Sequence, residues 1–222
     1  MKNKHYYIIL LGLMLQTVSL FAQTTSTEKS MFSIHAGPSR YMGKFIGITD
    51  YSDDYRDGLR DGFQWDVNYY YLGDRYIFNS CKLAPGLIYQ GGRFENSRDD
   101  SSDKIKMNYF APQLGLFMVK QKYNLSLSMG IGYQFYKNKS AVYNKPRNVS
   151  MNKAAYNLSA AGEYLLSPKW GVSAKLDWIM SSSDSYSVKY HGQTWQVELP
   201  DSSEGGGDYS RLSLVVGLNY HF

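Results

Sequence analysis

The sequence predicts an all-β fold, a single eight-stranded antiparallel up-and-down transmembrane β-barrel. The main observation is that bulky apolar residues alternate with small or polar residues along most of the 222-residue chain, which is the period of a strand with two unlike faces. The connections between these segments alternate between short and long, as expected for strands that run up and down across a membrane. After residue 22 no run of 18 apolar residues occurs, which excludes spanning helices.

The first four predicted strands cover residues 31–42, 63–72, 77–94 and 105–119. Their alternating apolar residues are Phe32, Ile34 and Ala36, then Trp65, Val67, Tyr69 and Tyr71, then Leu83, Pro85, Leu87 and Tyr89, then Phe110, Pro112, Leu114, Leu116 and Met118. Pro85 and Pro112 each remove a backbone donor inside a strand. We therefore expect a bulge at each proline.

The last four predicted strands cover residues 123–137, 152–166, 170–183 and 209–222. Their alternating apolar residues include Tyr123, Leu125, Leu127, Met129, Ile131, Tyr133 and Phe135, then Tyr156, Leu158, Ala160, Tyr164 and Leu166, then Trp170, Val172, Ala174, Leu176, Trp178 and Met180, then Leu212, Leu214, Val216, Leu218, Tyr220 and Phe222. Short links at 73–75, 120–122 and 167–169 leave long loops near 43–62, 95–104, 138–151 and 184–208. This alternation is typical of transmembrane barrels.

The apolar face of each strand is expected to contact lipid. An eight-stranded barrel has a narrow interior, which the opposite row of Gly, Ala, Ser, Asn and charged residues can fill. The aromatic residues, among them 21 Tyr and 4 Trp, collect toward both ends of the strands, as in the girdles at two membrane boundaries. The competing fold is a soluble lipocalin-like barrel, in which Leu127, Leu176 and Leu214 would converge in a dry centre.

The N-terminus has the pattern of a cleaved signal peptide, residues 1–22, followed by one barrel domain, residues 23–222. Lys2 and Lys4 precede an apolar stretch, and Leu20-Phe21-Ala22 ends on a small residue suited to cleavage. The alternative, a membrane anchor, needs about 20 apolar residues. Polar residues between 16 and 19 interrupt the stretch before that length is reached.

Charge and cysteine content exclude several classes of protein. Removing Lys2 and Lys4 lowers the net charge from +5 to +3, which is too weak to indicate nucleic-acid binding. The single Cys81 excludes an internal disulfide and a cysteine zinc site. We expect no cofactor and no metal site.

Six charged residues are predicted by parity to point into the lumen, three acids and three bases. They are Asp66, Lys82, Glu163, Lys175, Asp177 and Arg211. Buried charges are tolerated when they are paired, so balanced signs favour a cross-linked polar plug. The alternative is a narrow path for a solute or a proton.

No catalytic residues are predicted, and the chain is not expected to be an enzyme. His35, His191 and His221 fall on the first strand, in the last loop and at the opposite end, so they do not form one site. A Gly-x-Ser-x-Gly elbow is absent, and neither His35 nor His191 has a serine two residues later.

The predicted loops separate the charges by sign. The loops 43–62 and 95–104 are rich in acids, whereas the third loop region is basic. Its basic residues are Lys137, Lys139, Lys145, Arg147 and Lys153. One interpretation is pairing between loops and solvation. The other is that the basic residues contact lipopolysaccharide phosphates or another polyanion, and that the acidic loops hold divalent cations.

The last loop is predicted to contain a hairpin. Residues 187–190 and 194–199 alternate on either side of His191-Gly192-Gln193, and residues 201–208 are expected to be flexible. An exposed pair such as Tyr190 and Trp195 can anchor a protein partner, but packing within the hairpin is the preferred interpretation.

The terminal strand carries a more specific signal. Gly217, Tyr220 and the final Phe222 resemble the assembly signal of small Gram-negative outer-membrane β-barrel proteins, the porin-like group that includes OmpA-, OmpX- and OmpW-type barrels. Val215 departs from it, because a polar residue is usual there. The resemblance covers residues 23 to 222. It implies export to the cell outer membrane and assembly by the barrel-assembly machinery.

The predicted function is a structural, adhesion or protein-interaction module that acts through extracellular loops and has a largely plugged lumen. The expected partners are outer-membrane lipid, lipopolysaccharide and a protein at the loops. A narrow channel for small or hydrophobic solutes is the first alternative. A lipid-modifying outer-membrane enzyme is the second.

Overall fold

The structure is a computed structural model that describes residues 28–74, 76–77, 81–199 and 207–222. The predicted signal peptide, residues 1–22, lies outside the described residues, as does most of the segment 201–208 that was expected to be flexible. No helix among the described residues is long and apolar enough to cross a membrane.

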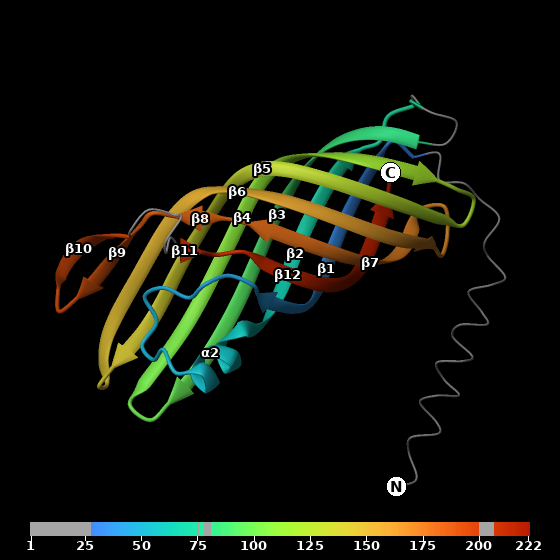
Figure 1. Ribbon diagram of the computed structural model, residues 1–222. Helices are drawn as coiled ribbons and strands as arrows, with labels where there is room; N and C mark the ends of the chain where they lie inside the picture. The colour runs from blue at the N-terminus through green and yellow to red at the C-terminus, as the bar shows by residue number, and fades with distance from the viewer. Residues whose placement is uncertain (1–27, 75, 78–80, 200–206) are drawn as a thin grey trace, which may run out of the picture.

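Eight antiparallel strands close into a barrel (Figure 1). They are β1 (Ser30–Tyr41), β2 (Asp61–Tyr71), β3 (Cys81–Arg98), β4 (Ser101–Val119), β5 (Tyr123–Val142), β6 (Lys145–Leu165), β7 (Trp170–Met180) and β12 (Arg211–His221). Each pairs with its neighbours along the chain, and β1 pairs with β12, which closes the sheet. Closure removes the sheet edges that would otherwise attract other strands. The predicted fold class is confirmed.

The two faces of the wall have the predicted orientation. Leu127, Leu176 and Leu214 are 51%, 48% and 56% exposed. Lys175 and Ser213, which alternate with them, are 5% and 1% exposed and point into the lumen. Apolar side chains therefore cover the outside of the barrel, as in a lipid environment, and the soluble lipocalin-like alternative is contradicted.

The polarity of the two faces reverses toward the end of the barrel farther from the C-terminus. On β4, Leu114 and Phe110 are exposed, whereas Ile105 and Met107 are buried and alternate with the exposed Lys106. On β5, Phe135 is exposed and its neighbour Tyr136 is buried. The strands therefore continue beyond the outer ring of aromatic residues as a water-exposed barrel with an apolar interior.

This reversal explains why two predicted loops are wrong. Most of the predicted loops 95–104 and 138–151 belongs to strands, and the chain reverses at Asp99-Asp100 and at Tyr143-Asn144. Tyr143 and Asn144 both have positive φ, which matches the twist of a two-residue hairpin turn. The apolar residues change from the outer to the inner face of these strands because the surrounding solvent changes from lipid to water.

The expected bulges at the prolines are absent. Phe110 pairs with Tyr133 and Gln113 with Gly130, so the register is the same on both sides of Pro112 and the ladder is only interrupted there. Pro85 pairs with Leu114 on β4, while the β2–β3 ladder stops at Gly86. Each proline therefore sits where a ladder is interrupted or has ended.

The remaining elements lie at the outer end. They are α2 (Asp53–Arg60), β8 (Ser182–Ser183), β9 (Ser185–Tyr190), β10 (Gln193–Glu198) and β11 (Gly207–Asp208). The predicted hairpin is present as β9 and β10, which turn at His191-Gly192. It does not stand alone, because β9 also pairs with the outer part of β6 (Figure 1).

A charge introduced on the wall tests the lipid-facing assignment. We expect Leu214→Lys to lower the free energy of unfolding in lipid vesicles by about 2–4 kcal/mol, because Leu214 lies in the middle of β12 on the outer face. Urea titration of the vesicle-bound protein measures this change. Tyr143→Lys, at the 81% exposed tip of the β5–β6 hairpin, is the control and should leave stability unchanged. Equal effects of both substitutions would contradict the assignment.

Candidate functional site

A buried carboxylate organises the middle of the lumen. Asp66 on β2 is 0% exposed, and its Oδ2 lies 2.8 Å from Lys175 Nζ on β7. Its Oδ1 lies 2.8 Å from His35 Nδ1 on β1, and Asn68 Nδ2 also donates to this oxygen. A carboxylate this deep in a narrow barrel requires such partners, because an unpaired buried charge is strongly destabilising.

The same histidine continues the hydrogen-bonded chain to a serine. His35 Nε2 lies 2.8 Å from Ser173 Oγ, and Ser173 Oγ donates to Asn219 Oδ1 at 3.0 Å. The order Asp66, His35, Ser173 is the order that activates a nucleophilic serine. In this barrel, however, Asp66 is shared with Lys175, and all three residues of the chain are buried.

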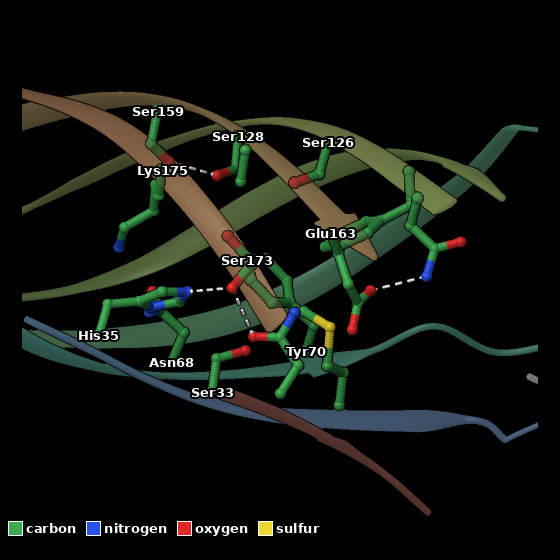
Figure 2. Close-up of a pocket in the computed structure, with 15 residues that line it drawn as sticks. Ser33, His35, Asn68, Tyr70, Ser126, Ser128, Ser159, Glu163, Ser173 and Lys175 are labelled. Carbon is green, nitrogen blue, oxygen red and sulfur yellow. Dashed lines mark hydrogen bonds between the residues drawn. The ribbon is translucent and has the colours of Figure 1, made fainter. Parts of the chain in front are cut away.

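The space beside Ser173 decides what this chain can do. The cavity that His35, Ser173, Glu163 and Tyr70 line has a volume of about 30 Å³ (Figure 2). A volume of roughly 30 Å³ suits a water molecule rather than an acyl substrate. The arrangement therefore links polar groups across the lumen by hydrogen bonds, and it offers no room for a larger ligand.

A second buried carboxylate has a histidine partner nearer the C-terminal end of the barrel. Glu163 Oε1 on β6 lies 2.7 Å from His221 Nε2 on β12, and Asn124 Nδ2 donates to Glu163 Oε2 at 2.7 Å. Beside it in the lumen, Met31, Tyr70, Leu72, Ala84 and Phe117 form an apolar cluster. This end of the lumen is therefore filled by one polar and one apolar group of side chains.

Arg211 and Asp177 lie in a third polar layer, toward the outer end. Arg211 is fully buried, and its Nε donates to Gln64 Oε1 at 3.0 Å. Asp177 Oδ2 accepts hydrogen bonds from Gln90 at 2.7 Å and Gln64 at 3.4 Å. Gln64 thus joins the guanidinium to the carboxylate, and the layer crosses the lumen.

An apolar plug closes the lumen above these layers. It consists of Tyr41, Phe45, Ile48, Tyr55, Leu59, Phe94, Ile105, Met107, Tyr136, Val149, Met151 and Tyr209. Phe45 comes from the connection between β1 and β2, and its ring stacks on Tyr41 with centroids 4.2 Å apart. The connection therefore folds into the barrel mouth instead of extending into solvent.

One carboxylate fastens this connection to the wall. Asp103 on β4 is 0% exposed and accepts hydrogen bonds from the Thr49 backbone N–H at 2.9 Å and from the Tyr55 hydroxyl at 2.9 Å. Asn138 on β5 donates to its other oxygen. Burial raises the pKa of Tyr55 to about 12, and the Asp103 charge adds to this rise. Tyr55 therefore remains a donor at neutral pH.

The structure distributes the six predicted lumen charges over separate levels. Asp66 and Lys175 share the middle, Asp177 and Arg211 lie outward of them, and Glu163 pairs with His221. Lys82 does not join any of these groups. Its Nζ donates to the Gly73 carbonyl at 2.9 Å and lies over the Tyr76 ring, at the turn after β2.

The five basic residues of the predicted third loop lie on strands. Lys137 and Lys139 are exposed on β5, and Lys145 is exposed at the start of β6. Arg147 is turned toward the plug, where Nη2 donates to the Gly47 carbonyl at 2.7 Å. Lys153 pairs with Asp184 at 2.6 Å. These residues therefore belong to a paired β5–β6 hairpin and not to a loop, and their contact with a polyanion stays a prediction.

The predicted assembly signal has Gly217 and Tyr220 on β12 and Phe222 directly after its end. Tyr220 packs its ring against Trp170 and Phe222, with centroids 4.8 Å and 5.8 Å apart. A Cβ at Gly217 would lie 2.1 Å from the Ile34 carbonyl oxygen and 2.5 Å from the His35 ring. Glycine at this position therefore allows β12 to approach β1 beside the buried His35.

Two features of the lumen were not predicted from the sequence. The hydrogen-bonded chain of Asp66, His35 and Ser173 joins residues far apart in sequence, and the shared inward parity of these residues was its available signal. The plug was not predicted because apolar and polar residues do not alternate regularly along residues 43–52, which supply Phe45 and Ile48. In the described part of the chain, no three His, Cys, Asp or Glu residues gather as metal ligands would.

Comparison with a family of proteins extends these findings. A family model described as "Putative MetA-pathway of phenol degradation" matches residues 75–199, more than half of the chain. No curated protein matches the sequence significantly.

Several solved structures share the fold. A major outer membrane protein from Thermus thermophilus has a TM-score of 0.53 and 15% identity, and covers 87% of this chain and 99% of its own. Neisserial surface protein A has a TM-score of 0.51 and 10% identity, with coverages of 87% and 97%. OprG from Pseudomonas aeruginosa has a TM-score of 0.50 and 10% identity, with coverages of 90% and 99%. At these identities the likeness concerns the fold alone.

A double-mutant cycle tests the pairing at Asp66. We expect Lys175→Met to cost about 3–5 kcal/mol of unfolding free energy, because it leaves a buried carboxylate without its cation. Adding Asp66→Asn should recover part of this loss. Urea unfolding in vesicles measures each variant.

Lys153→Met is the matched control for this cycle. It removes a lysine from an ion pair with Asp184, which is exposed, so stability should change little. If Lys175→Met were as mild as this control, or if its effect simply added to that of Asp66→Asn, the pair would not hold the lumen together.

Proposed function

The chain belongs to the family described as putative MetA-pathway of phenol degradation, and from this premise and its closed barrel we propose a non-enzymatic outer-membrane protein that presents its outer end as an interaction surface. Residues 1–22 act as a cleaved export signal, and residues 23–222 form the barrel in the cell outer membrane. Gly217, Tyr220 and Phe222 are the residues that the barrel-assembly machinery recognises in this proposal.

The observation that carries the proposal is the plug. Twelve apolar residues fill the outer mouth, and the buried Asp103 fastens the connection that supplies Phe45 and Tyr55. Three polar layers and a second apolar cluster fill the lumen below. A barrel filled at every level is suited to presenting a surface rather than to conducting solutes.

The outer end offers a large surface for partners. Exposed Lys137, Lys139 and Lys145 are placed to attract lipopolysaccharide phosphates, and the strength of this attraction should fall with salt. Tyr143 at the β5–β6 tip is 81% exposed, and Trp195 on β10 is 45% exposed. Exposed aromatic residues of this kind are common anchors for a protein partner.

A second candidate function is a narrow path for small hydrophobic solutes. The description of the family, which concerns phenol degradation, favours it, and the plug is partly carried by a connection rather than by the wall alone. If this function holds, a strain without the protein should grow more slowly on limiting phenol than its parent. Equal growth of the two strains would count against it.

Conductance separates the two functions directly. We expect the purified chain in planar bilayers to give no steady current steps, because side chains occupy the lumen from the Glu163–His221 pair to the plug. A known porin recorded in the same bilayers is the control for detection. Reproducible steps from the wild-type protein would contradict the proposed function and support the narrow path.

A further inference from the structure

The ladder that pairs β6 with its neighbour is interrupted on one side of the barrel, just beyond the outer aromatic ring. The β6–β7 ladder ends at the pair Tyr156 and Met180, and β6 is next paired at Ser150, with Ser187 of β9. Between these pairs, residues 151–155 of β6 have no ladder partner on this side among the described residues. The chain crosses the interruption as residues 181–186.

A groove of about 310 Å³ lies at this interruption. Ser150 pairs with Ser187, and Ser187 pairs with Gln196, so these three side chains form a row across β6, β9 and β10 on one face. Asn152 lies on the same face of β6, and its carbonyl accepts a hydrogen bond from Tyr133 at 3.2 Å. The groove thus gathers hydroxyl, amide and phenol groups from four strands.

Most of these polar groups have unused hydrogen-bonding capacity. The side chains of Ser187, Gln196 and Asn152 make no hydrogen bond within the described residues, although each borders the groove. An amide side chain both donates and accepts, and a hydroxyl does the same. The groove can therefore form several hydrogen bonds with a ligand without breaking internal ones.

The charges at the groove are already balanced. Lys153 is the charged residue that lines it, and its Nζ lies 2.6 Å from Asp184 Oδ1. Ser185 also donates to this carboxylate at 3.1 Å. A phosphate would have to compete with Asp184 for the lysine, so the groove favours a neutral polar ligand.

A second hollow on the barrel wall is lined by apolar residues and so differs from the polar groove. It has a volume of about 620 Å³ and lies among Leu114, Met129, Ile131 and Leu158, on the lipid-covered part of the barrel. Its surface is aliphatic and suits acyl chains. The polar groove instead lies beside Tyr133, at the level where the wall leaves the hydrocarbon and where the sugars of surface glycolipids begin.

We propose that the groove between β6 and the β9–β10 hairpin binds a neutral, hydroxyl-rich sugar unit. The proposal rests on the proposed function, since it gives the interaction surface a ligand class. Asn152, Ser187 and Gln196 bind the sugar hydroxyls, and Tyr133 forms the wall on the membrane side. The sugar belongs to a glycolipid of the same membrane or to a free saccharide.

Calorimetric titration of the full chain in phospholipid nanodiscs tests this proposal. The probe is a neutral oligosaccharide of hexoses. We expect binding that weakens about tenfold or more in the double variant Asn152→Ala with Gln196→Ala, because truncation removes two hydrogen-bonding side chains. Gln193→Ala is the matched control. Gln193 is an exposed glutamine on β10 outside the groove, so binding should not change.

A second set of nanodiscs, containing a neutral glycolipid with the same oligosaccharide as its headgroup, distinguishes the sources of the sugar. Binding of the free oligosaccharide identifies a soluble saccharide as sufficient, whereas a variant-sensitive interaction seen only with the lipid-anchored form identifies the membrane glycolipid. Failure of both probes to bind would overturn the proposal, as would binding that the double variant leaves unchanged. Conductance of the same purified protein in planar bilayers reports separately on the proposed function, so the two failures can be told apart.

Discussion

The strands of this barrel pass from hydrocarbon into water. Their outward side chains must therefore be apolar where lipid surrounds the barrel and polar where water surrounds it. Inside the membrane every backbone polar group needs a partner in the wall, which only a closed sheet provides for strands. Side chains follow the same constraint. Leu114 on β4 faces outward where lipid surrounds the barrel, and Met107 on the same strand faces inward where water surrounds it. The aromatic residues Phe110 and Phe135 mark the transition.

The narrow lumen follows from that closure and determines what the protein can do. Side chains from opposite walls meet, so a charge such as Asp66 survives by pairing with Lys175 and His35. Above the membrane, the inward apolar residues need a cover, which the β1–β2 connection supplies through Phe45 and Tyr55. The polar layers and the plug thus both fill a lumen in which side chains from opposite walls are in contact. Together they leave the outer end as the location of the interaction surface that we propose.

The sequence predicts the membrane part of the fold well. There, apolar residues alternate with polar ones along each strand, and lipid surrounds the face that carries the apolar residues. The inward Lys175 and outward Leu176 could be assigned from alternation alone. Beyond Phe110 apolar residues move to the inner face and polar residues to the outer face, and residues 95–104 were predicted as a loop where β3 and β4 continue. The candidate sites were less predictable. Ser173 contacts His35 because of the register between strands, which the sequence of one strand does not determine. Asp103 contacts Thr49, which lies in the β1–β2 connection, where apolar and polar residues do not alternate regularly.

Quenching of single-tryptophan variants by brominated lipids tests the central claim most directly. Trp65, Trp170, Trp178 and Trp195 are similarly exposed, at 42%, 49%, 43% and 45%. Only the first three lie on the membrane wall, whereas Trp195 lies on β10. With the other tryptophans changed to Phe, the account predicts strong quenching of each wall tryptophan and weak quenching of Trp195. Equal quenching at all four positions, or none at the wall, would contradict it.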